Sequence, residues 1–180
     1  EKLCGLSKGK SRNLRGYATE MLAQIAVTLQ SLDILQVSLS SIMLNIKLKH
    51  VYLRINIFNA FRIVLRNMEL WKENEHLLAI INQIQNSARE VLLPILSSVV
   101  CGNSESKELF ESAAALWARC VIAFNWSELS PKDAASVFSK VDSLFDNDDG
   151  KSVDLAELLF LYSNDQNSWN FVSPFAVKIA

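Results

Sequence analysis

The sequence predicts an all-α fold. Apolar residues recur every three or four positions over most of the 180-residue chain, as they do on one face of a helix. Only five glycines and three prolines are present, which is few for the many turns of a β-sandwich. Hydrophobic residues make up 50% of the chain, so it can bury a core and is not expected to be disordered. We expect about seven helices joined by short connections.

The first three helices are expected within the first third of the chain. Over residues 14–29 the apolar residues on one side of the helix are Leu14, Met21, Leu22, Ile25, Ala26 and Leu29. A second helix is expected over 32–46. Residues 49–67 are apolar nearly all round, and their β-branched content also suits strands. The length of this segment without Gly or Pro favours a buried helix.

Four more helices are expected in the rest of the chain. The first runs from about 71 to 96, with a kink at Pro94, because the proline ring clashes with the preceding turn. The break Cys101-Gly102-Asn103-Ser104 separates it from a helix over 105–124.

The helix expected after residues 105–124 has a strong start signal. Ser130-Pro131-Lys132-Asp133 combines a capping residue, a proline at the first helical position and an acid, and it predicts a helix over 131–145. A last helix is expected over about 153–163.

These helices can form either an irregular bundle or a solenoid of stacked helical hairpins. A spacing of about 20 residues per helix gives pairs near the roughly 40-residue period of armadillo and HEAT arrays. Leu53-Arg54, Ala60-Phe61 and Leu65 resemble the second helix of a HEAT repeat, although Ile57 stands where a small residue is usual. Residues 111–123 resemble the alanine-rich third helix of an armadillo repeat. The resemblance implies a helical-repeat scaffold.

Charge is distributed unevenly along the chain. Residues 1–66 carry ten Lys and Arg against three acidic residues, a net charge of +7, and residues 67–180 carry −8. Either the two parts neutralise each other, or the basic part attracts an acidic partner. Nucleic acid is a further alternative, although nucleic-acid binders usually show a cleaner cationic stripe.

We expect one all-helical domain over residues 1–180 that belongs to a larger intracellular protein, nuclear or cytoplasmic. Glu1 is not a start methionine, and the stretch 171–179 is too apolar to lie free in water. The three cysteines include no close pair, which is typical of reduced thiols. Polar residues interrupt the apolar tract 21–46, so no membrane partner is expected.

Few residue patterns in the chain suggest catalysis. His50 and His76 are the only histidines, and each is expected at a surface or a helix end rather than as a base. The segment 5–11 ends in Gly-Lys-Ser, but it lacks the spacing and the preceding strand of a phosphate-binding loop. We therefore expect a protein that is not an enzyme and holds no cofactor, with calcium as the one alternative.

That alternative rests on residues 146–157, which resemble an EF-hand calcium loop. The candidate oxygen ligands are Asp146, Asp148, Ser152, Asp154 and Glu157, the last as a bidentate ligand. Gly150 and Lys151 depart from the motif, because they stand where a ligand and a glycine are required. The competing interpretation is an acidic turn in which Ser152 caps, and Asp154 stabilises, the following helix.

These observations favour a non-enzymatic scaffold or adaptor that mediates protein–protein interaction within a larger complex. Its partner would be a helix or peptide. The candidate partner-binding residues are Lys47, Arg54, Arg62 and Arg66 in the basic part and Trp169, Phe171 and Phe175 near the carboxyl end. The aromatic residues are expected to supply binding energy and the basic residues to steer association. A regulatory module with a degenerate calcium loop and a nucleic-acid-associated helical-repeat protein are the two alternatives.

Overall fold

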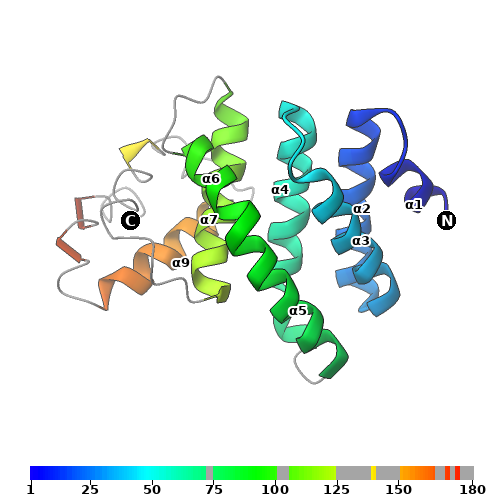
Figure 1. The fold of residues 1–180 in the computed structure, drawn as a ribbon. Coiled ribbons are helices and arrows are strands. Elements are labelled where there is room, and N and C mark those ends of the chain that lie inside the picture. The colour runs from blue at the N-terminus through cyan, green and yellow to red at the C-terminus, as the bar shows by residue number, and fades with distance from the viewer. Residues whose placement is uncertain are drawn as a thin grey trace. The chain divides into compact units, whose positions relative to one another are not determined.

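The computed structural model describes residues 1–71, 75–100, 106–124, 139–140, 151–164, 169–170 and 173–174 (Figure 1). Within these ranges the structure is helical and contains no strand, as the sequence predicts. The chain forms two compact units, Glu1–Leu96 and Ser97–Ala180. An irregular helical bundle fits the structure. The solenoid arrangement and the single domain remain predictions.

The first unit is built on three helices that alternate in direction, with a short helix packed on the first of them. These helices are α1 (Lys2–Ser7), α2 (Arg12–Leu29), α3 (Leu32–Asn45) and α4 (Val51–Arg66). The α2–α4 and α2–α3 pairs pack most closely, and α1 packs on α2. Because α3, which follows α2 and precedes α4 in the sequence, runs in the opposite direction to both, α2 and α4 begin at the same end of this unit, at the top of Figure 1. The three longer helices confirm the predicted ranges, and α1 was not predicted.

Local hydrogen bonds explain the two reversals. Gln30 adopts a left-handed conformation (φ 50°, ψ 38°), and the N–H of Ser31 donates to the Ala26 carbonyl at 3.0 Å, which ends α2. The Ser31 hydroxyl then accepts the Ile34 N–H and caps α3. At the next reversal His50 Nδ1 accepts the Leu53 N–H at 3.4 Å and caps α4. His50 therefore lies at a helix end, as the sequence predicts.

Small and polar residues allow the helices of the first unit to pack closely. A Cβ atom at Gly16 would lie 3.1 Å from Asn56 Cβ, so the backbone of α2 lies close against the Asn56 side chain of α4. Thr19 of α2 and Ser41 of α3 share a hydrogen bond of 2.6 Å between their hydroxyl oxygens. Phe58 and Phe61 of α4 are fully buried. Residues 49–67, whose β-branched content also suited strands, therefore contain the buried helix α4.

The predicted helix near residues 71–96 is divided into three parts. A 3-10 turn at Met68–Trp71 precedes α5 (Glu75–Ser87), a π-helical turn (Ala88–Leu92) and α6 (Leu93–Val100). Pro94 lacks an N–H, and its ring would crowd the Glu90 carbonyl four residues earlier. The wider π turn includes Glu90 and relieves this clash.

The described part of the second unit consists mainly of α7 (Lys107–Phe124) and α9 (Lys151–Ser163), which pack against each other. Trp117 of α7 and Leu158 of α9 are buried. The helix predicted over 131–145 lies outside the described residues, apart from 139–140. No described helix combines the length and the apolar character that crossing a bilayer requires.

Candidate functional site

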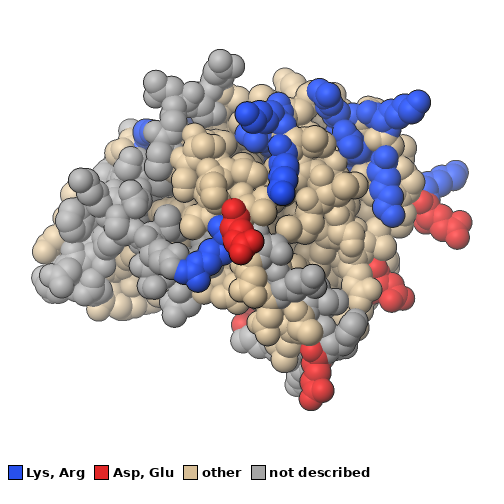
Figure 2. Space-filling model, viewed as in Figure 1, with Lys and Arg blue, Asp and Glu red and all other residues tan. Residues whose placement is uncertain are grey.

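Basic side chains gather where α2 and α4 begin. Lys10 and Arg12 lie at the start of α2, and Lys47 and Lys49 lie in the connection that leads into α4; all four are exposed. Figure 2 shows Lys and Arg side chains clustered over this part of the first unit. We call these four residues the basic end. The two helix amino termini add partial positive charge, so the basic end attracts anionic groups.

Arg54 holds the connection that carries two of these lysines. Its Nε donates to the Leu48 carbonyl at 3.0 Å, across the turn between α3 and α4. The side chain is half-buried, and this burial lowers the pKa of its guanidinium, which stays charged because arginine titrates far above neutral pH. Arg54 therefore positions Lys47 and Lys49 and is itself only partly accessible.

Large apolar side chains are exposed at the same end. They are Leu14 and Tyr17 of α2, Leu44 of α3, and Val51 and Tyr52 of α4. Tyr52 precedes Asn56 by one helical turn, and Asn56 faces Gly16 of α2, so Tyr52 lies on the side of α4 that faces α2. Exposed apolar residues that gather in this way are typical of interaction sites.

The apolar spacing of the sequence assigned three exposed residues of α2 to its buried side. Leu14, Met21 and Leu29 were grouped with the core side of α2, but each is about half exposed or more. Leu22 and Ala26 of the predicted side are buried, and the rest of the buried side consists of Gly16, Ala18, Thr19 and Ala23. Small residues form this side because α1, α3 and α4 all pack on α2.

The structure does not bring the four predicted basic partner residues into one surface. Lys47 is exposed and Arg54 half-buried near the start of α4, whereas Arg62 and Arg66 lie more than two turns further along. Arg62 is buried and Arg66 is exposed.

Of the predicted aromatic partner residues, only one can be placed. Trp169 is half-buried. Phe171 and Phe175 lie outside the described residues.

The described part of the calcium-like segment is helical. Helix α9 begins at Lys151, so its first two turns contain Ser152, Asp154 and Glu157. The other two candidate ligands, Asp146 and Asp148, lie outside the described residues. An EF-hand places its ligands around a loop, and three residues of one straight helix cannot enclose an ion in this way.

The two described carboxylates of that segment face a cation. Arg119 Nη1 of α7 lies 2.6 Å from Glu157 Oε2 and 3.8 Å from Asp154 Oδ1. Asp154 is fully buried in the first turn of α9, where its charge also favours the helix amino terminus. In this conformation these carboxylates link α9 to α7. Among the described residues there is no group of three or more His, Cys, Asp or Glu that could hold a metal ion.

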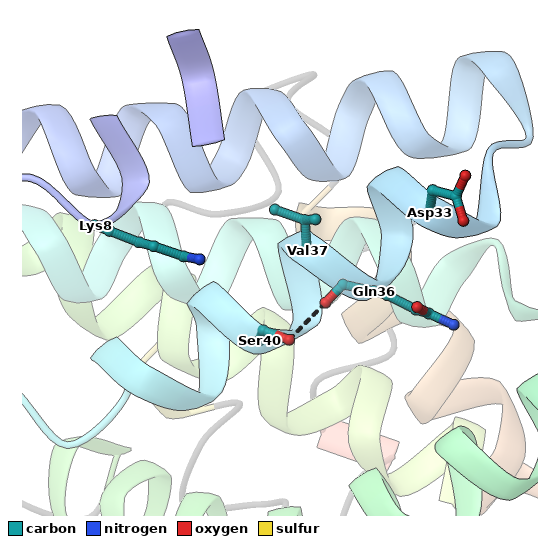
Figure 3. A pocket seen from close by; sticks show the side chains of 5 residues that line it. All are labelled: Lys8, Asp33, Gln36, Val37 and Ser40. Atoms are coloured by element: carbon teal, nitrogen blue, oxygen red, sulfur yellow. Dashed lines mark hydrogen bonds between the residues drawn. The ribbon is translucent and has the colours of Figure 1, made fainter. Parts of the chain in front are cut away.

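A shallow hollow of about 370 Å³ lies between α1 and α3 in the first unit. Lys8, Asp33, Gln36, Val37 and Ser40 line it (Figure 3). The Ser40 hydroxyl donates to the Gln36 backbone carbonyl at 2.8 Å, so its proton is already engaged. One lysine, one aspartate and one amide can hold a small polar molecule, but the lining contains no nucleophile paired with a base.

Cysteine chemistry is not favoured at Cys120. Its side chain is fully buried in α7, and this burial raises the pKa of the thiol well above its usual range, although the nearby Arg119 charge acts in the opposite direction. A thiol that keeps its proton is a poor nucleophile.

Comparison with known proteins gives no relative for this chain: no protein-family model matches it, and no curated protein or solved structure does.

Proposed function

We propose that this protein is a non-enzymatic helical scaffold or adaptor that binds other proteins within a larger intracellular complex. The observation that carries the proposal is the meeting of exposed cations and exposed large apolar side chains where α2 and α4 begin. Interfaces combine aromatic or aliphatic anchors with a polar rim, and this end of the first unit presents both.

The two kinds of residue support different parts of binding. Tyr17 and Tyr52 are large, rigid side chains of the type that dominates interface energies. The lysines and Arg12 lie where they accelerate encounter with an acidic partner and make it sensitive to salt. In the apolar carboxyl-terminal stretch, Trp169 is a candidate second contact.

The proposal is tested by affinity capture from cell extract followed by reconstitution with purified partner. We expect Lys47→Glu with Lys49→Glu to lose the partner, because these two lysines are exposed and their replacement leaves the core unchanged. Charge reversal at Arg54 or Arg62 would test folding instead, since Arg54 bonds to Leu48 and Arg62 is buried.

Lys2→Glu with Lys107→Glu is the matched control, because it changes the net charge equally at two exposed lysines outside the basic end. This control is expected to retain the partner. A purified chain that retains no protein and turns over a substrate would contradict the proposed function.

A further inference from the structure

We propose that the end of the first unit where α2 and α4 begin binds an acidic amphipathic helix of another protein. The inference rests on the proposed function and specifies its partner and its surface. This docking surface consists of Lys10, Arg12, Lys47 and Lys49 together with Leu14, Tyr17, Leu44, Val51 and Tyr52.

The apolar part of the docking surface consists of large side chains that are more than a third exposed. Tyr17, Leu44 and Tyr52 are 58%, 61% and 59% exposed. They come from three different helices, and each lies within about two turns of the same end of the unit. On α2, Leu14, Tyr17 and Met21 follow the spacing of one helical face, so they form a stripe that extends away from the end.

The charge of the docking surface selects an acidic partner. The sequence contains no acidic residue within 2–19 or within 34–68, and these stretches include the segments 10–19 and 44–54 that build this end. Lys10, Arg12, Lys47 and Lys49 form no ion pair with any described residue. Their charges are therefore available to a partner's carboxylates, which would lie beside its apolar stripe.

A helix fits this surface better than other occupants. The described residues of the first unit offer no strand edge to which an extended peptide could be added, and recognition by side chains then favours an amphipathic helix. A nucleic acid would use the cations and stack on the tyrosines, but it has no use for the exposed aliphatic residues Leu14, Leu44 and Val51.

Binding is measured by fluorescence anisotropy with the full chain and a labelled synthetic helix. The peptide carries Leu and Phe at positions i, i+3, i+4 and i+7 and Glu at its flanks. We expect it to bind at least about tenfold more tightly than a scrambled peptide of the same composition and than a version with Lys in place of Glu. Its affinity should fall as salt is raised.

Two matched pairs of variants locate the contact. Leu14→Ser and Leu29→Ser change the same residue type on the same helix, and the side chains are 49% and 65% exposed at opposite ends of α2. We expect Leu14→Ser to weaken binding about tenfold and Leu29→Ser to change it less than about twofold. Lys47→Glu with Lys49→Glu should weaken binding by a similar factor, and Lys2→Glu with Lys107→Glu should not. Circular dichroism verifies that each variant is folded.

The outcomes that would overturn the proposal are distinct. They are equal binding of the scrambled peptide, equal losses in Leu14→Ser and Leu29→Ser, or tighter binding of duplex DNA, RNA or phosphatidylserine vesicles to the same residues. If a captured protein partner is nevertheless lost in Lys47→Glu with Lys49→Glu, the proposed function stands and only the acidic helix is wrong. If neither the peptide nor any captured protein responds to this variant, the proposed function fails too.

Discussion

At the scale of single residues, Gly16 sets the distance between two helices. The Cβ that any other residue would add lies 3.1 Å from both Cβ and Nδ2 of Asn56. Asn56 cannot easily move away, because its Nδ2 also donates to the Tyr52 carbonyl at 2.8 Å. The sequence alone shows a glycine inside a helical pattern, and only the packing of α2 on α4 explains it.

Gly16→Val is therefore expected to destabilise the fold. The added atoms meet Asn56, and overpacking of this kind costs about 1–3 kcal/mol. Gly5→Val is the control, because nothing lies within 4 Å of the Cβ position at Gly5. Urea denaturation followed by circular dichroism should show a clear loss for Gly16→Val only, partly recovered when Asn56→Ala is added. Equal effects at the two glycines would contradict this account of the contact.

The buried thiol leads to a second prediction at this scale. Because burial raises the pKa of Cys120, the thiol should resist alkylation by iodoacetamide in the native protein, and raising the pH from 7 to 9 should not increase the rate. Cys4 is half-buried and should react sooner. Mass spectrometry of the modified peptides separates the two sites. Rapid native labelling of Cys120 would show that α7 is not packed as described.

At the scale of elements, helix positions could be predicted from the sequence, but the directions of their side chains could not. Apolar spacing and capping residues located α2, α3, α4 and α7 to within a few residues, because these signals are local. Leu14, Met21 and Leu29 were assigned wrongly to the buried side of α2 because α1 was not foreseen, and because small residues, with Leu22 alone among the leucines, line the contacts of α2. The π turn before Pro94 likewise depends on how the helix avoids a clash.

The link between α7 and α9 provides a test at the scale of elements. Arg119→Met removes a cation beside the fully buried Asp154, and breaking a buried pair from one side costs about 3–5 kcal/mol. Glu157→Gln removes the charge of the exposed carboxylate that pairs with the same arginine. This change should lower the free energy of unfolding by less than about 1 kcal/mol. Chemical denaturation of the two variants measures the difference. Similar small losses would mean that Arg119 does not stabilise α9.

At the scale of the whole molecule, the basic residues predicted as a binding face are redistributed by the topology of the first unit. Charge counting identified a basic part of the chain, but Arg62 and Arg66 lie in the last two turns of α4, away from Lys47, which precedes its start. Lys10 and Arg12 lie there instead, since α2 and α4 run in the same direction. Such grouping depends on contacts between residues far apart in sequence, which helical periodicity does not encode.

The exposure of the apolar residues escaped prediction for the same reason. An apolar residue at helical spacing indicates a core position unless the packing is known. Tyr17 and Tyr52 are therefore candidates for binding only because the structure leaves both side chains exposed near the starts of α2 and α4.

Docking of the acidic amphipathic peptide is measured by hydrogen–deuterium exchange of the full chain with and without the peptide. Docking at this surface predicts slower exchange on binding in the segments that contain residues 10–21 and 44–54, because the docking surface is built from them. It predicts no change in the segments that contain residues 28–33 and 66–70, which lie at the opposite end of the same helices. Protection confined to that opposite end or to α7 and α9, or no protection at saturating peptide, would contradict it.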